Sequence, residues 1–394
     1  MHLTQTPWAK ALLLTATVLT AAAFPAISFA QIPTSTAVGP DAQHNVSGSR
    51  ESQVVEDQIR SFNNLVGTWP KYTEISAEAQ VAAMGPGINI IGGYDPYWTG
   101  EKTTFTDADI KRVKEAGFKT IRVPLFTFKH IADTQGHLDP KWLDRLDHII
   151  DLAVKNKLTV ILDEHDFEDC AKDVDACAIL LPNIWYDLSE RYKGAPSSVV
   201  FELLNEPNGN VDAKIWNTWI PDLISIVRET NPTRNIIIGP VMWNSADQLS
   251  TLELPATDRH LIATFHYYTP MEFTHQGASW AGPDLEKLRG VHWTGTAEQQ
   301  AAINTTFDKV TAWSKANNRP IFLGEYGTYG KFNDQIDDRA AWTRAVSKAA
   351  DDRGFARAYW YYQDGGGFGV WDAEKGVWVK PLLKALLPNS PAAQ

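Results

Sequence analysis

The sequence predicts an α/β protein and, more specifically, a closed (β/α)8 TIM barrel. From about residue 87 onward, short runs of β-branched or apolar residues alternate with polar turns and with segments of 3.6-residue periodicity. Eight such runs occur, and most of their residues are apolar, as expected of parallel strands that are buried on both faces. A doubly wound open sheet is the alternative, but no glycine-rich dinucleotide fingerprint follows the first run.

The expected strands and helices follow one another in regular order. The strands are Gly87–Gly92, Thr120–Leu125, Leu158–His165, Val199–Glu206, Asn235–Val241, Leu261–Tyr268, Pro320–Tyr326 and Ala356–Gln363. The clearest helical periodicity lies in Pro140–Lys155, Ala213–Thr230, Thr296–Ala316 and Ala340–Asp352. Asp, Thr or Pro stands near several helix starts, as is typical of helix N-termini.

The first 30 residues predict a cleaved export signal. Lys10 precedes an apolar run from Ala11 to Phe24, and Ser28-Phe29-Ala30 has small residues where a signal peptidase reads the chain. A membrane anchor is the alternative, but the run is only about 14 residues, short of the ~20 that a span requires. We therefore expect an exported protein, periplasmic or extracellular, with no membrane attachment after cleavage.

Three segments are expected along the chain. Residues 1–30 form the signal peptide, residues 31–75 a polar linker and N-terminal lead-in, and residues 76–390 the barrel. Part of the lead-in, from Ser52 to Leu65, is expected to be helical.

The charge of the chain argues against nucleic acid as its partner. Lys and Arg number 36 against 47 Asp and Glu, a formal net charge of −11, whereas phosphate recognition needs a basic surface. The 15 Trp residues are the unusual feature of the composition, because Trp gathers where flat apolar faces are bound. Sugar rings are one partner of this kind.

Cys170 and Cys177 are the only cysteines. Export places them in an oxidising compartment, which favours a small loop disulfide between them. Two metal ligands are the alternative, but the second Cys or His pair of a structural zinc site is missing.

Polar residues gather at the expected C-terminal ends of the strands, where (β/α) barrels hold their reactive groups. In strand order they are Arg122, Asp163-Glu164-His165, Asn205-Glu206-Pro207, His266-Tyr267-Tyr268, Glu325-Tyr326-Gly327 and Trp360. Glu206 and Glu325 end strands on opposite sides of one opening. Each follows an apolar run in which an unpaired carboxylate is costly, so the sequence predicts a pair of carboxylates across a cleft.

Two facing carboxylates suit the cleavage of a glycosidic bond. One protonates the leaving oxygen, while the other attacks the anomeric carbon or activates water. If both point into the barrel axis, we expect them about 5 Å apart, the separation typical of retaining enzymes. Arg122 would keep the nucleophile ionised by its charge, and Tyr268 by a hydrogen bond.

Residues 85 to 388 resemble the family 5 glycoside hydrolases, the cellulase-like members of their clan. The most specific match is Leu203-Leu204-Asn205-Glu206-Pro207, and a second is Phe322-Leu323-Gly324-Glu325-Tyr326-Gly327. The resemblance implies that Glu206 is the acid/base, that Glu325 is the nucleophile and that Asn205 contacts the 2-hydroxyl of the sugar. By strand order and local motif it also implies substrate contact by Arg122, His165, His266, Tyr268 and Trp360.

Two segments of this chain depart from the family pattern, and both bear on the identity of the substrate. Asp163-Glu164-His165-Asp166 is more acidic than the usual segment after the third strand, and Gly93-Tyr94-Asp95-Pro96-Tyr97-Trp98 fits no subgroup. Trp98, Trp243, Trp280, Trp293 and Trp371 are candidates for further sugar subsites.

The expected function is a secreted endo-acting hydrolase of β-1,4-glucan that retains configuration by double displacement. A β-mannanase or another β-glucan or xyloglucan hydrolase is the alternative within the family, and a non-catalytic carbohydrate-binding barrel is the alternative outside it. A metal-dependent barrel hydrolase would need a His-X-His pair where the first strand reads Gly-Ile-Asn-Ile-Ile-Gly. We expect no metal or cofactor, a β-linked polysaccharide or oligosaccharide as the substrate, and a monomer.

Overall fold

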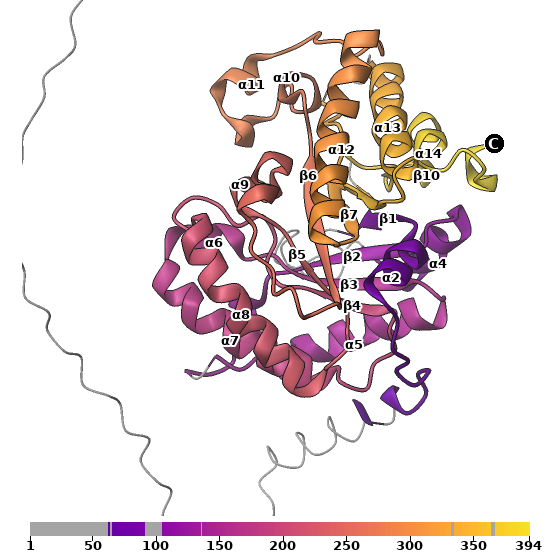
Figure 1. Ribbon diagram of the computed structural model, residues 1–394. Helices are drawn as coiled ribbons and strands as arrows, with labels where there is room; N and C mark the ends of the chain where they lie inside the picture. Colours follow the sequence, from indigo (N-terminus) through magenta and orange to yellow (C-terminus); the bar gives the residue numbers. More distant parts are fainter. Residues whose placement is uncertain (1–61, 64, 91–104, 135, 332–334, 364–366) are drawn as a thin grey trace, which may run out of the picture. The chain divides into compact units, whose positions relative to one another are not determined.

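Eight parallel strands form a closed barrel, as the sequence predicts. The computed structural model describes residues 62–63, 65–90, 105–134, 136–331, 335–363 and 367–394. Each strand is hydrogen-bonded to the next along the chain, and β1 (Pro86–Asn89) pairs with β8 (Ala356–Tyr359) to close the ring. The helices lie outside the strands (Figure 1). The fold is therefore a (β/α)8 TIM barrel.

The remaining strands lie within the predicted runs. They are β2 (Thr120–Leu125), β3 (Thr159–Glu164), β4 (Val199–Glu202), β5 (Ile236–Ile238), β6 (Leu261–Tyr267) and β7 (Ile321–Tyr326), with a small hairpin of β9 (Trp371–Asp372) and β10 (Val377–Trp378) after the barrel. The strand β4 is shorter than predicted, although its backbone hydrogen bonding continues. The N–H of Asn205 still donates to the carbonyl of Glu164 at 2.7 Å, so the chain keeps its direction up to Glu206.

Helices follow the strands in the order expected of a barrel. They are α2 (Ala77–Met84), α4 (Asp107–Ala116), α5 (Pro140–Lys155), α6 (Phe167–Lys172), α7 (Val174–Arg191), α8 (Ala213–Thr230), α9 (Val241–Asn244), α10 (Met271–Thr274), α11 (Pro283–Lys287), α12 (Ala297–Asn317), α13 (Ile336–Asp351) and α14 (Lys380–Leu386), with 3-10 turns η1 (Thr127–His130), η2 (Ala246–Thr251), η3 (Ser279–Ala281) and η5 (Pro391–Ala393).

Helix ends follow from local capping. The bounds of α5 and α8 agree with those predicted, because Asp139 and Asp212 accept hydrogen bonds from first-turn backbone amides. At the start of α12, Thr296 and Gln299 form a reciprocal capping box. The helix α13 begins at Ile336, four residues before the predicted start.

The N-terminal end of the barrel is closed by α2. Ala77, Val81 and Met84 of this helix are buried together with one layer of inward-facing strand residues. That layer consists of Ile161, Val200, Ile237, Ile262, Phe322, Ala356 and Ala358. This end of the barrel is therefore an apolar core.

The described part of the predicted lead-in packs against the barrel helices. Trp69 is 6% exposed and donates a hydrogen bond from Nε1 to Asp151 of α5 at 3.1 Å. The hydroxyl of Tyr72 lies 3.1 Å from that of Thr233. The predicted signal peptide, residues 1–30, and nearly all of the predicted helix from Ser52 to Leu65 lie outside the described residues, so both stay predictions.

Within the described residues, no helix is long and apolar enough to cross a membrane.

Candidate active site

The structure brings the eight predicted site residues together at the C-terminal ends of the strands. They are Arg122, His165, Asn205, Glu206, His266, Tyr268, Glu325 and Trp360, and hydrogen bonds, ion pairs or a ring stack join each of them to another member of the set. They come from β2, β6, β7 and from the segments that follow β3, β4, β6 and β8. Six of the eight strands therefore contribute to one site.

Arg122 is the centre of this site and is fully buried. Its guanidinium group binds both carboxylate oxygens of Glu202, at 2.7 and 3.0 Å. It also contacts Asp163 at 3.0 Å, Glu325 at 2.9 Å and the side-chain oxygen of Asn205 at 2.8 Å. One buried cation thus balances three acidic side chains and orients an amide, a geometry that Arg allows because its donors form a rigid planar fork.

Glu325 has each of its carboxylate oxygens held by a different donor. Oε1 accepts a hydrogen bond from Arg122 at 2.9 Å, and Oε2 accepts one from the hydroxyl of Tyr268, also at 2.9 Å. Burial raises the pKa of Glu325, while the charge of Arg122 and the hydrogen bond from Tyr268 oppose that rise. These two donors are the ones that the sequence predicts.

Glu206 is placed by an unusual backbone conformation. Its φ is +42°, in the left-handed region, and this turns the chain at the point where the hydrogen bonding of β4 ends. Its Oε1 lies 2.6 Å from Nδ1 of His266. Burial, followed by the nearby charge of Glu325, raises the pKa of Glu206 well above its usual range.

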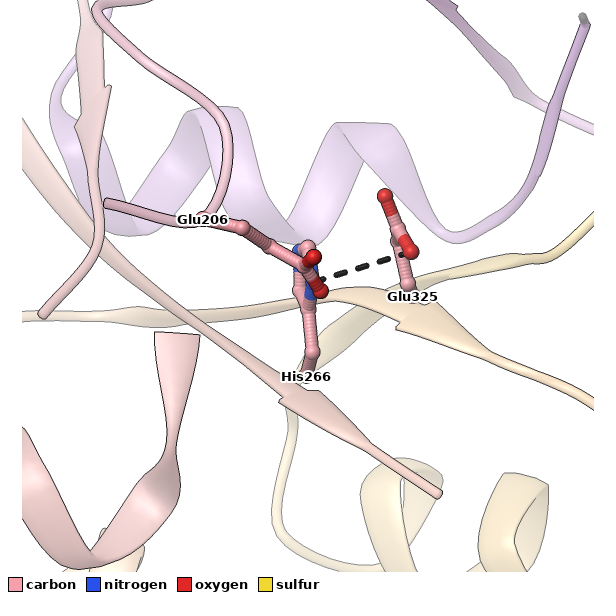
Figure 2. A group of neighbouring side chains, drawn as sticks. All are labelled: Glu206, His266 and Glu325. Carbon is pink, nitrogen blue, oxygen red and sulfur yellow. Dashed lines mark hydrogen bonds and ion pairs between the residues drawn. The ribbon is translucent and has the colours of Figure 1, made fainter. Parts of the chain in front are cut away.

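The two glutamates face each other beside His266 (Figure 2). A carboxylate oxygen of Glu206, a carboxylate oxygen of Glu325 and a ring nitrogen of His266 all lie within 4.8 Å of one another. This separation agrees with the expected distance of about 5 Å, which is too short to place a water molecule between a carboxylate and the face of a sugar ring, as inversion requires. The geometry therefore suits direct attack by one carboxylate.

His165, Asn205 and Trp360 form the floor beside the carboxylates. The rings of His165 and Trp360 are stacked, with centroids 5.7 Å apart and an interplanar angle of 9°. Nδ1 of His165 lies 2.6 Å from Asp163, and Nδ2 of Asn205 lies 3.4 Å from its Nε2. Burial and then the charge of Arg122 lower the pKa of His165 to about 3, so the ring is neutral. Trp360 is half-buried.

Sequence reasoning missed two buried residues of the site. Asn89, at the end of β1, accepts a hydrogen bond from Arg122 at 2.9 Å. Glu202, inside the apolar run of β4, holds Arg122 with both of its carboxylate oxygens. A polar residue within an otherwise apolar strand is the signal that each of them carries, because burial obliges such a residue to find a partner.

The tryptophans proposed for further subsites differ in their positions. Trp243 and Trp280 are 50% and 61% exposed, in segments that follow β5 and β6. Trp293 is 2% exposed and belongs to the hydrophobic core, so a subsite role for it is wrong. Trp371 packs on Trp378 and beneath Arg112, and Trp98 lies outside the described residues.

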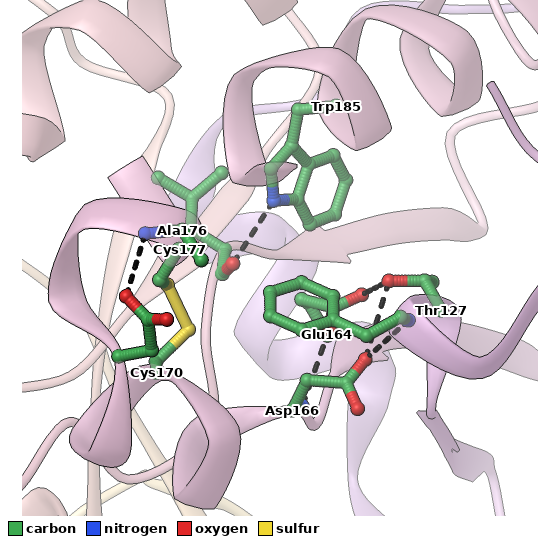
Figure 3. The surroundings of a disulfide bond; sticks show 10 residues. Thr127, Glu164, Asp166, Cys170, Ala176, Cys177 and Trp185 are labelled. Atoms are coloured by element: carbon green, nitrogen blue, oxygen red, sulfur yellow. Dashed lines mark hydrogen bonds between the residues drawn. A yellow bond between two sulfur atoms is a disulfide. The ribbon is translucent and has the colours of Figure 1, made fainter. Parts of the chain in front are cut away.

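The acidic segment after β3 is explained by a local network (Figure 3). The hydroxyl of Thr127 contacts Glu164 at 2.7 Å and Asp166 at 3.3 Å, and Asp166 also accepts a hydrogen bond from the N–H of Phe128. Nearby, a disulfide joins Cys170 of α6 to Cys177 of α7. The network ties the segment around His165 to Thr127 and Phe128, and the disulfide fastens together the two helices that follow it.

Facing glutamates after β4 and at the end of β7 of a (β/α)8 barrel place this chain in the class of glycoside hydrolases. Comparison with known proteins identifies one family within that class. The family model described as Cellulase (glycosyl hydrolase family 5) matches residues 78–366, and the chain therefore belongs to family 5 of the glycoside hydrolases.

Relatives within the family include proteins named as endoglucanases. Endoglucanase H of Acetivibrio thermocellus is 32% identical over 76% of this chain, and the match spans 31% of that longer protein. A solved structure described as a hyperthermophilic endo-β-1,4-glucanase in complex with substrate is 35% identical, covers 80% of this chain and 100% of its own, and has a TM-score of 0.75. The Cel5A of Thermotoga maritima in complex with mannotriose is 32% identical, with a TM-score of 0.74 over 79% of this chain and 99% of its own.

Proposed function

We propose that this protein is an endo-acting β-1,4-glucanase that cleaves its substrate with retention of configuration. The observation that carries the proposal is the close approach of Glu206 and Glu325, each held by its own donors, within 4.8 Å. Relatives that are named as endoglucanases support the choice of β-1,4-glucan as substrate.

The first chemical step forms a covalent glycosyl-enzyme. An oxygen of Glu325 attacks the anomeric carbon, and the bond from that carbon to the glycosidic oxygen breaks. Glu206 gives its proton to the departing oxygen, so the released sugar leaves as a neutral alcohol. Arg122 and Tyr268 keep the attacking carboxylate ionised and oriented before the step.

The second step reverses the proton transfer. Burial still raises the pKa of Glu206 at this stage, but once Glu325 is an ester it carries no charge, so the repulsion that adds to this rise disappears. Glu206 then takes a proton from water, which attacks the anomeric carbon and releases Glu325. The mutual repulsion of the two carboxylates thus lets one residue act first as acid and then as base.

Substrate binding is assigned to the floor of the site. Trp360 offers part of a flat ring for stacking on a sugar. The oxygen of Asn205 is occupied by Arg122, and one amide hydrogen faces Nε2 of His165, so the second amide hydrogen remains to donate to a sugar hydroxyl. Neutral His165 can offer Nε2 to a sugar hydroxyl in place of its long contact with Asn205, because Nδ1 is held by Asp163. None of these roles requires a metal or a cofactor.

The direct test is a reducing-sugar assay on soluble β-glucan, carboxymethyl cellulose, mannan, xylan and xyloglucan. We expect release from β-1,4-glucan with a rapid fall in viscosity, and loss of release in Glu206→Gln and Glu325→Gln. Release from mannan alone would favour a mannanase, a possibility raised by the relative crystallised with mannotriose. No release from any polymer would overturn the proposal and favour a binding protein.

We also propose that the chain is exported after cleavage behind Ala30 and acts as a monomer. The N-terminal sequence motif supports the export. Sequencing of the protein recovered from the periplasm or medium should begin at Gln31, and retention of residues 1–30 would contradict this.

A further inference from the structure

Asn244 has a buried side-chain amide that lies behind Glu206 and Glu325. It has no role in the reaction steps proposed above. It ends α9, where Met242, Trp243 and Asn244 have φ of +57°, +57° and +51°. Three consecutive left-handed residues turn the chain sharply, which is rare outside glycine because of the clash of Cβ with the backbone. The exposed fraction of Asn244 is 0%, whereas Met242 and Trp243 are half exposed. The turn therefore directs one polar side chain inward.

The space for this side chain is kept by a glycine. A Cβ atom at Gly239 would overlap the amide group of Asn244, so the close approach requires glycine there. The next residue in the chain, Ser245, is paired with His266 of β6 in a parallel bridge. The turn after β5 is thus fastened to the residue that contacts Glu206.

The amide of Asn244 contacts the ring nitrogen of His266 that faces away from the carboxylates. Nδ2 of Asn244 lies 3.3 Å from Nε2 of His266. The opposite ring nitrogen, Nδ1, lies 2.6 Å from Oε1 of Glu206 and 3.7 Å from Oε2 of Glu325. Among the described residues, Oδ1 of Asn244 has no hydrogen-bond partner. The three side chains form a relay that runs from Asn244 through His266 to Glu206.

The tautomer of His266 decides which of its two ring nitrogens carries the proton. Burial, followed by the charge of Arg122, lowers the pKa of His266 well below its usual value, so the ring is neutral. A neutral imidazole donates from one nitrogen and accepts at the other. Because the amide of Asn244 donates to Nε2, the ring proton is left on Nδ1.

We propose that Asn244 is a positioning residue that fixes the tautomer of His266 and thereby decides which oxygen of Glu206 carries the acid proton. With its proton on Nδ1, His266 donates to Oε1 of Glu206. The acid proton must then reside on Oε2, the oxygen that His266 leaves free for the glycosidic oxygen. In the other tautomer, Nδ1 would accept the proton of Glu206 and draw it away from the substrate. This inference rests on the proposed acid/base role of Glu206.

The decisive variant is Asn244→Asp. It keeps the size and shape of the side chain and suits a left-handed backbone, but as a carboxylate it can only accept a hydrogen bond at Nε2. It therefore forces a proton onto Nε2 and disfavours the working tautomer. We expect kcat/KM for an aryl cellobioside with a poor leaving group to fall about 10²-fold or more, within the range that general acid catalysis contributes. The kcat/KM for dinitrophenyl cellobioside should change little, because its leaving group needs no proton.

A control and a direct reading of the tautomer accompany this comparison. Asn318→Asp makes the same change at another left-handed Asn, exposed at the end of α12, and should leave both substrates unaffected. In protein with 15N-labelled histidine, the resonances missing from His266→Gln identify the ring of His266, and the parent should show its proton on Nδ1.

Each outcome bears on one claim. A proton on Nε2 in the active parent would overturn the inference, as would equal losses on both substrates or no loss on either in a folded Asn244→Asp variant. If the parent cleaves neither substrate, the proposed function fails instead, while the 15N spectrum still reports the tautomer.

Discussion

The two ends of the barrel are built from the same eight strands but bury opposite kinds of side chain. At the N-terminal end, α2 and seven inward-facing strand residues form an apolar layer that includes Met84 and Phe322, with Gln80 of α2 as a buried polar neighbour. At the C-terminal end, the buried residues include Arg122, Asp163, Glu202 and Glu325. The apolar layer and the charged network are therefore only a few residues apart along the strands.

The difference shows how a buried charge network is accommodated. A buried ion pair is a poor source of stability, because desolvation of the charges cancels most of their attraction. The apolar end supplies free energy by burial of hydrocarbon, whereas the charged end uses the rigid strands to hold donors in place for the reaction. Stability and activity should therefore respond separately to changes at the two ends.

The largest effect on kcat is expected from a substitution that removes a reacting group without disturbing the fold. Glu325→Gln keeps the shape of the side chain but removes the proposed nucleophile, so kcat should fall by at least ~10³-fold while the circular dichroism spectrum stays unchanged. Glu298→Gln, on the exposed first turn of α12, is the matched control and should keep full activity. A Glu325→Gln enzyme as active as the parent would remove Glu325 from the mechanism.

Arg122→Met is expected to damage both stability and activity. It leaves Glu202, Asp163 and Glu325 buried without their common cation. Breaking a buried pair in this way costs about 3–5 kcal/mol in the free energy of unfolding, measurable by denaturant titration. Arg344→Met changes an exposed Arg on α13 and should have little effect. A stable Arg122→Met protein would show that the acidic groups do not depend on Arg122.

Met84→Ala tests the opposite end of the barrel. Met84 is fully buried in the apolar layer, so its truncation should lower the free energy of unfolding by about 2–5 kcal/mol. The kcat of the folded enzyme should not change, because the charged end is untouched. A reduced kcat at temperatures where the variant is fully folded would show that the two ends are coupled.

The smallest effect concerns the pH dependence of stability at the charged end. Burial lowers the pKa of His275, which packs against the ring of Tyr268, to about 4. The folded state therefore keeps this ring neutral while the unfolded chain takes up a proton below pH ~6.5. The resulting stability is present above that pH and is lost progressively as the pH falls toward 4.

His275→Gln should remove this contribution. The difference in unfolding free energy between pH 7 and pH 5 should shrink by about 1–2 kcal/mol relative to the parent. His148→Gln, on the exposed side of α5, serves as the control. A wider gap between the two pH values in His275→Gln would contradict the assigned direction.

The sequence by itself determined the fold class and the meeting of two carboxylates at one end of the barrel. Strand and helix periodicity is local, so eight alternating units could be read directly from the chain. A parallel barrel brings all strand ends to one face, so Glu206 and Glu325 had to meet although 118 residues separate their positions. Their positions after buried strands were therefore sufficient to predict the pair.

Beyond the two predicted donors Arg122 and Tyr268, only the tertiary structure decided how those carboxylates are held. Two contacts join residues from different strands and turns: the bidentate ion pair of Glu202 with Arg122, and the contact of Asn244 with His266. The left-handed φ of Glu206 also depends on its surroundings in the fold. The burial of Trp293 likewise follows from packing around it rather than from its neighbours in sequence. Periodicity reports which face of an element is buried, but the partner of a buried polar group depends on distances across the barrel, and these exist only once the chain has closed.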